Sequence, residues 1–165
     1  MKKSRYIAVM GLMLALASAL QFLESLISLP LPMGVKAGFS SIVVMYVLTE
    51  FGFASAMTIA VLKSCFVFVT RGASAFCMSV SGGILSVLAM GLVVLVSRKS
   101  KDGAGILTMS VSGGVFHNIG QLAAASAIAE SLVTASYLPV LIISGIISGI
   151  VTGTLFRVLM PCIKK

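Results

Sequence analysis

The most constraining feature of this sequence is an apolar run at residues 105–129 that contains the only histidine of the chain. The run is long enough to span a bilayer, because about 20 residues at a rise of 1.5 Å each cross the hydrocarbon layer. His117 is followed at once by Asn118, and on a helix Gly113, His117 and Gln121 share one face. Polar groups at that depth are unfavourable in lipid, so this face should point toward other helices or a cavity.

The composition predicts an integral membrane protein. The chain is 59% hydrophobic and 10% charged, whereas a soluble domain carries roughly 25% charged residues. The length suits a single transmembrane domain over residues 1–165 in a lipid bilayer. A net charge of +8 would suggest a nucleic-acid partner in a soluble protein. Here the basic residues cluster at the ends of apolar segments, so membrane topology explains them and no nucleic-acid partner is expected.

Prolines, glycines and charge clusters divide the chain into apolar segments of helical length. The predicted fold is an all-α integral membrane protein, a compact bundle of about six transmembrane helices. The second and third segments are short and closely joined. The predicted spans cover residues 5–28, 39–50, 53–69, 74–96, 105–130 and 138–160.

The distribution of lysine and arginine predicts the orientation of the bundle. With both termini inside, nine of these residues flank the spans on the cytoplasmic side. The outer side then holds only Lys36 and Arg71, while Lys63 lies within a span. Both termini are therefore expected to be cytoplasmic.

The N-terminal segment also resembles a secretory signal. Basic residues precede an apolar run, and Ala17, Ser18 and Ala19 resemble a cleavage site. The apolar character continues past that site to Leu29, so we expect the segment to be retained as the first span.

Two stripes of small residues recur at intervals of four. Such stripes allow the backbones of membrane helices to approach closely. They have two interpretations, packing within the bundle or docking onto another membrane protein, and the first span is the better candidate for docking. The stripes consist of Gly11, Ala15 and Ala19 on the first span and of Gly145, Gly149 and Gly153 on the sixth.

A six-residue repeat, MSVSGG, occurs at residues 78–83 and again at 109–114. The two copies begin successive spans that cross the membrane in opposite directions. This placement indicates an inverted-repeat relation of the kind found in many transporters.

Polar residues gather in the outer half of the predicted bundle, which predicts a pocket open to the outside. Two or three cations with one acid suit an anionic or zwitterionic ligand, and histidine, asparagine and glutamine can add directional hydrogen bonds. The candidate substrate-binding residues are Gln21, Glu24, Lys36, Lys63, Arg71, His117, Asn118 and Gln121.

Each of these residues also has a structural interpretation. Glu24 and Lys63 could neutralise one another. Lys36 and Arg71 could be ordinary loop charges, and His117 could form an interhelical hydrogen bond. The agreement of all of them on one side of the membrane favours a binding site.

The sequence gives little support for catalysis, a metal or a cofactor. Asp102 is the only aspartate, so no Ser-His-Asp set is available. Cys65, Cys77 and Cys162 lack metal-ligand spacing, and we expect them to pack as small apolar side chains. A phosphate-binding GxxxxGK[ST] loop is absent, so transport would need a partner or an ion gradient.

Four short stretches carry a resemblance to a known family. They are LPLP at residues 29–32, GVKAG at 34–38, SGG at 81–83 and HNIGQ at 117–121. With them the chain resembles, over nearly its whole length, a small bacterial membrane family labelled "heptaprenyl diphosphate synthase component I" or "Gx transporter". That family is similar to the substrate-binding S-components of energy-coupling factor transporters.

The resemblance implies a six-helix protein of the bacterial cytoplasmic membrane. S-components capture a vitamin or precursor outside the cell and dock on a transmembrane coupling subunit that carries two ATPases. In them a small-residue stripe on the first helix contacts that subunit, and Ala15 and Ala19 fit this stripe. The implied function is capture of a small compound, anionic or related to isoprenoids, quinones or vitamins, for uptake with a partner energising module.

The synthase label conflicts with the residues present. Prenyl chain elongation uses aspartate-rich motifs that hold magnesium on the diphosphate, and a single aspartate cannot form them. We therefore expect no catalysis by this chain alone. Two alternatives remain open, a non-catalytic membrane subunit associated with prenyl diphosphate synthesis and a membrane anchor of an extracellular electron-transfer assembly.

Overall fold

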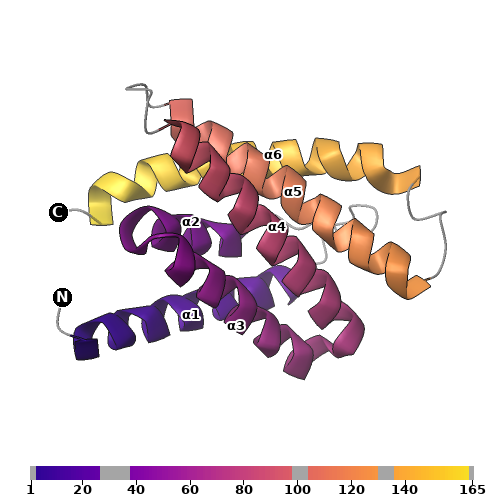
Figure 1. Ribbon diagram of the computed structural model, residues 1–165, viewed down its shortest axis with the longest axis horizontal. Helices are drawn as coiled ribbons and strands as arrows, with labels where there is room; N and C mark the ends of the chain where they lie inside the picture. The colour runs from indigo at the N-terminus through magenta and orange to yellow at the C-terminus, as the bar shows by residue number, and fades with distance from the viewer. Residues whose placement is uncertain (1–2, 27–37, 98–103, 130–135, 164–165) are drawn as a thin grey trace.

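The computed structural model describes residues 3–26, 38–97, 104–129 and 136–163, and these residues form six α-helices. In Figure 1, α1 and α6 run along opposite edges of the molecule, α2 lies between them, and α4 and α5 cross them obliquely. The start of α1 and the end of α6 lie at the same end of the molecule. The bounds are α1 (Lys3–Leu26), α2 (Phe39–Phe51), α3 (Phe53–Arg71), α4 (Ala73–Ser97), α5 (Ala104–Ala129) and α6 (Leu138–Ile163).

The predicted helices are all present, with differences at their ends. α3 continues through Thr70 to Arg71 instead of ending at residue 69. The chain leaves the helix only at Gly72, where φ is +87°, a conformation that glycine adopts without a steric penalty. α6 continues past Pro161 to Ile163 instead of ending at residue 160. Pro161 lies in the last turn, so few later hydrogen bonds depend on it. The predicted ends at residues 28 and 130 lie outside the described residues.

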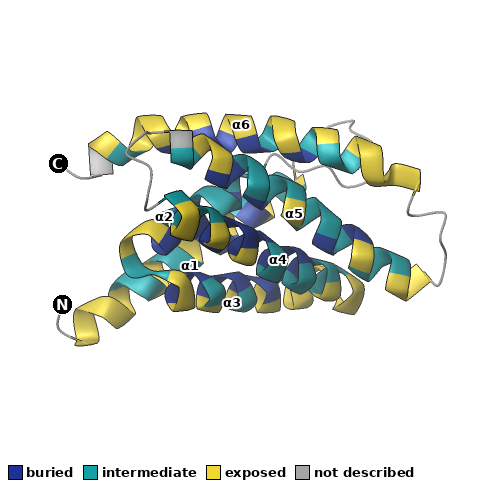
Figure 2. Cartoon of the chain, turned by 45° about the horizontal axis from the view of Figure 1, so that its top comes forward, coloured by how far each residue is buried: buried dark blue, intermediate teal, exposed yellow. Residues whose placement is uncertain are grey.

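The chain is a membrane protein, and the regular structure of its described residues is helical. Among the described residues, α1, α3, α4 and α6 are long and apolar enough to cross a membrane. α5 has sufficient length but carries the polar residues noted above. α2 has 13 residues, about 20 Å of helix, which is shorter than a hydrocarbon layer of about 30 Å. Large apolar side chains on α1 and α6 are exposed, among them Leu12 at 65% and Ile147 at 59%. Figure 2 shows exposed residues recurring along α6.

The glycine stripe of α6 packs against α5, as one of the two interpretations of the sequence predicted. A Cβ atom built on Gly149 would lie 2.6 Å from the Cα of Val111, and one built on Gly145 would lie 2.9 Å from the Cα of Val115. These contacts are backbone contacts, so no side chain can move aside. The stripe of α1 differs, because Gly11 has no neighbour within 4 Å of such a Cβ.

We expect Gly149→Ala to destabilise the bundle and Gly11→Ala to leave it unchanged. The alanine methyl at position 149 would force α5 and α6 apart, and overpacking of this kind costs about 1–3 kcal/mol. Thermal unfolding of both variants in the same detergent measures the effect. Equal unfolding temperatures would contradict the α5–α6 packing described here.

The two copies of the MSVSGG repeat make equivalent contacts. The first serine of each copy bonds to a hydroxyl on a neighbouring helix: Ser79 lies 2.9 Å from Ser64 of α3, and Ser110 lies 2.8 Å from Thr152 of α6. The last glycine of each copy lies against the same neighbouring helix as its serine. The pairs α3–α4 and α5–α6 are thus joined by the same chemistry.

Candidate functional site

A polar pocket lies where all six helices converge. Its cavity volume is about 30 Å³, and a water molecule requires roughly 10–15 Å³ of such space. The pocket therefore has room for a group of about the size of two water molecules. Six of its lining side chains carry hydroxyl groups, namely Ser40, Ser41, Ser86, Ser110, Ser148 and Thr152.

The structure brings together six of the eight candidate substrate-binding residues. Gln21, Glu24, Lys63, His117, Asn118 and Gln121 all line the pocket. Arg71 is not among its lining residues, because it lies exposed in the last turn of α3. There its positive charge suits the negative end of the helix dipole. Lys36 lies outside the described residues.

Glu24 of α1 caps the start of α2. Its Oε1 atom accepts hydrogen bonds from the backbone N–H groups of Phe39 and Ser40, the latter at 3.3 Å. The first turn of a helix leaves several N–H groups without partners, and the residue before it, Gly38, has no side chain that could serve them. A carboxylate also suits the positive end of the helix dipole. Glu24 thereby fixes the position at which α2 begins.

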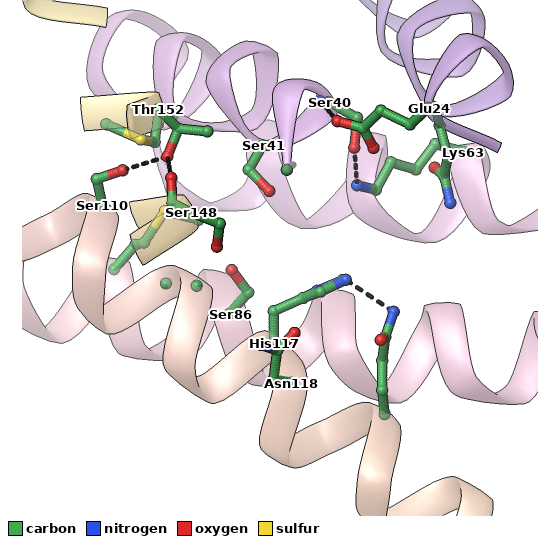
Figure 3. A pocket seen from close by; sticks show the side chains of 17 residues that line it. Glu24, Ser40, Ser41, Lys63, Ser86, Ser110, His117, Asn118, Ser148 and Thr152 are labelled. Carbon is green, nitrogen blue, oxygen red and sulfur yellow. Dashed lines mark hydrogen bonds between the residues drawn. The ribbon is translucent and has the colours of Figure 1, made fainter. Parts of the chain in front are cut away.

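Lys63 of α3 is buried beside this cap. Its side chain is 3% exposed, and its Nζ atom donates a hydrogen bond to the Oγ atom of Ser40 at 3.2 Å. Ser40 thus joins the Lys63 ammonium to the Glu24 carboxylate, as Figure 3 shows. This arrangement supports the interpretation that the two charges balance each other. It also places a cation in the wall of a polar pocket.

His117 and its neighbours on α5 form the opposite wall (Figure 3). The Nε2 atoms of His117 and Gln121 lie 3.0 Å apart, within the same helix. Asn118 instead donates hydrogen bonds to α6, to the carbonyl oxygen of Leu141 at 2.8 Å and to the Oγ atom of Ser144 at 3.1 Å. Asn118 therefore joins two helices, which is a structural role in addition to its place in the pocket.

Gly82 of α4 permits the close approach of His117. A Cβ atom built on Gly82 would lie 2.8 Å from the backbone oxygen of His117 and 3.0 Å from its Nδ1 atom. Any side chain there would displace α5 or rotate the imidazole ring. The SGG motif of α4 thus positions the histidine of the pocket.

The hydroxyl residues of the pocket were missed by the sequence reasoning. Small hydroxyl residues are frequent wherever membrane helices touch, so Ser86 carries no distinctive signal. Ser110 belongs to the second MSVSGG copy, but that repeat was not linked to the pocket. Ser40 and Ser41 had one, because only Phe39 separates them from the GVKAG stretch that carries the family resemblance.

A second cavity, of about 420 Å³, opens between α1, α2 and α6. Apart from the side chain of Tyr46, its lining consists of aliphatic, methionine and phenylalanine side chains. The lining residues include Met13, Leu16, Leu20, Ile42, Tyr46 and Leu155. We refer to it as the apolar groove.

Comparison with known proteins agrees with the resemblance seen in the sequence. Residues 13–159 match the family model described as heptaprenyl diphosphate synthase component I. No curated protein and no solved structure matches the chain.

Proposed function

This chain belongs to the heptaprenyl diphosphate synthase component I family, and we propose that it is a non-catalytic membrane component that captures a small polar compound. In this proposal the compound binds from outside the cell, and a partner energising module drives its uptake. The observation that carries the proposal is the buried polar pocket, in which Lys63 and the capped start of α2 face His117 across a cavity.

The proposed topology has six helices in the bacterial cytoplasmic membrane with both termini in the cytoplasm. The start of α1 and the end of α6 lie on the same side of the molecule (Figure 1), which supports this arrangement. Lys3, Arg5 and Arg157 belong to those two segments, whereas Arg71 ends α3. α2 would cross only the cytoplasmic half of the membrane, with its N-terminus at the pocket.

The chemistry of the pocket supports a ligand with a compact polar head. Half-length helices whose N-termini face a binding site near the membrane centre are a recurrent device in transporters. The cavity of about 30 Å³ accommodates a carboxylate, a hydroxyl or an ammonium group. A larger compound, such as a vitamin precursor or a quinone-related acid, would place its head here, and the helices would separate to admit the rest.

The partner in this proposal is a transmembrane coupling subunit with an ATPase pair, and it docks on α1. Gly11, Ala15 and Ala19 are all exposed in the structure, so this stripe is accessible to another helix. The chain has no nucleotide-binding loop, which is why uptake would depend on such a partner.

We expect Ala15→Leu to reduce partner binding about tenfold while the protein still folds. A leucine at this exposed position would hold a docking helix away, and inserting a larger side chain into a close contact costs about 1–3 kcal/mol. Ala123→Leu, at an exposed alanine of α5, is the matched control. The measurement is the amount of coupling subunit that co-purifies with each variant. Equal amounts would remove the α1 stripe from the proposal.

The experiment that tests the function itself is gentle solubilisation of the tagged protein from its native membrane, followed by identification of what co-purifies. An ATPase pair with a transmembrane coupling subunit would support capture and uptake. A soluble prenyltransferase, or an extracellular redox protein, without any ATPase would overturn it.

A second candidate is a non-catalytic membrane subunit associated with prenyl diphosphate synthesis. The printed family description favours it, and so does the apolar groove, whose aliphatic lining could hold part of an isoprenoid chain. In that case isoprenoid lipids should co-purify with the wild-type protein. Leu16→Gln in the groove should reduce their amount without affecting the polar pocket.

A further inference from the structure

We infer that the molecule captured in the polar pocket presents a hydrogen-bond donor, an O–H or N–H group, to the side chain of Gln21. This inference rests on the proposed function and narrows its substrate class. It begins with Gln21, which is 9% exposed and lines the pocket. Within the described part of the chain, the buried Oε1 atom of Gln21 has no hydrogen-bond partner.

The orientation of the Gln21 amide follows from its neighbours. Its Nε2 atom lies 3.4 Å from the Oγ atom of Ser79, which lies 2.9 Å from the Oγ atom of Ser64. Ser64 in turn lies 2.9 Å from the carbonyl oxygen of Ala60, which can only accept. All three contacts are hydrogen bonds at once only if Ser64 donates to Ala60, Ser79 donates to Ser64, and Gln21 donates to Ser79. The remaining atom of the amide is therefore an acceptor.

A buried acceptor without a donor is unfavourable by about 1–3 kcal/mol, so an unpartnered buried acceptor points to a group that is absent from the structure, such as a ligand. The position of Gln21 agrees with this. The α1 backbone packs against α2 and α3, and the Gln21 side chain reaches past them to Ser79 on α4. Gln21 is also one helical turn from Glu24, and Ser64 is adjacent in sequence to Lys63. Gln21 also lines the pocket together with Glu24 and Lys63, so its amide group lies near the two charged residues.

The charged residues of the pocket limit the net charge of the ligand head. Among the described residues that line the pocket, Lys63 and Glu24 are the ones with a permanent charge, and they sum to zero. A fully ionised diphosphate head would bring several negative charges and no donor, so it fits neither the charge balance nor Gln21. A neutral or zwitterionic head fits both, with an acceptor for the three-donor ammonium of Lys63 and an O–H or N–H for Gln21. Amino acids and amide-bearing heterocycles have such heads.

The test compares the wild-type protein with Gln21→Met and Gln21→Glu, each purified identically from membranes of the cells that produce it. Denaturation releases any bound small molecule, which is identified and quantified by mass spectrometry, and thermal unfolding is measured on the same samples. Thr154→Val is the control, because Thr154 is exposed on α6 and bonds within that helix.

We expect Gln21→Met to retain at least tenfold less compound and to unfold at the same temperature as the wild type or higher. The methionine side chain has nearly the same length as that of glutamine and lacks the unpartnered acceptor atom. Gln21→Glu keeps an acceptor oxygen at the same place and should retain more compound than Gln21→Met. The released compound should carry an O–H or N–H group. Thr154→Val should match the wild type in both measurements.

Three outcomes would overturn the inference. The first is a compound with no O–H or N–H group. The second is full retention by Gln21→Met, which would mean that a water molecule alone serves the acceptor. The third is a lower unfolding temperature of Gln21→Met together with its loss of compound, which would indicate a structural role. If His117→Ala loses the compound at an unchanged unfolding temperature and Gln21→Met keeps it, only this inference fails. If the wild type releases no compound, the proposed function fails with it.

Discussion

Lys63→Met is expected to abolish ligand capture and to destabilise the bundle at the same time. Lys63 is buried and is joined through Ser40 to the carboxylate of Glu24. Removing one member of a buried charge pair leaves the other uncompensated, at a cost of about 3–5 kcal/mol. Loss of a buried charged contact to the ligand should weaken binding by roughly 30-fold or more, which corresponds to about 2 kcal/mol or more.

A double variant separates the two effects. In Glu24→Gln/Lys63→Met both charges are gone, and the glutamine oxygen can still accept hydrogen bonds from the start of α2. We expect this variant to regain most of the lost stability and none of the ligand capture. The measurements are the unfolding temperature and the amount of small molecule released per mole of purified protein.

Two results would argue against the charge pair as the centre of the site. If the double variant captured the compound as well as the wild type, Lys63 would be a structural residue. If the single variant were as stable as the wild type, Glu24 would not depend on Lys63. The bridge through Ser40 would then contribute little.

The helices could be predicted from the sequence because each boundary has a local cause. Gly52 and Gly72 adopt positive φ values of 88° and 87° in one-residue turns, and apolar runs of suitable length flank them. The end of α6 was wrong by three residues, because proline was expected to end a helix even where only its last turn remained. The start of α2 at residue 39 was predicted correctly. Its cap was not predicted, because nothing in the sequence shows that Glu24 of α1 serves the first N–H groups of α2.

The site was predictable where polar residues are rare. An apolar helix is interrupted by each of His117, Lys63 and Gln21. A polar side chain is energetically unfavourable in lipid, so these three residues could be recognised from the sequence. Arg71 was placed in the same set because the predicted topology puts this cation at the outer end of the third span. It lies eight residues beyond Lys63, about two helical turns, and is not among the residues that line the pocket. The serines were missed for the opposite reason, since a hydroxyl that bonds to its own helix is common and inexpensive. The hydrogen bond between Ser110 and Thr152 becomes apparent only when α5 is seen packed against α6.

His117→Ala is expected to weaken capture by about 10- to 100-fold with little change in stability, whereas Asn118→Ala should have its main effect on stability. The side-chain hydrogen bond between His117 and Gln121 lies within α5, so the loss of this bond removes no link between two helices. Asn118 bonds to two groups of α6, so its loss should weaken the α5–α6 contact by about 0.6–2 kcal/mol. The effect on capture follows from removing one polar group that contacts the ligand, worth about 1–3 kcal/mol.

The comparison of these adjacent residues distinguishes a binding site from helix packing. Both line the same pocket and both are polar, so nonspecific damage to α5 would affect the two variants alike. If His117→Ala lowers the unfolding temperature as much as Asn118→Ala and retains the compound, the histidine serves packing. The polar residues that line the pocket would then serve as contacts between helices. If it loses the compound at an unchanged unfolding temperature, the imidazole contacts the ligand, and its position against Gly82 is a requirement of capture rather than of folding.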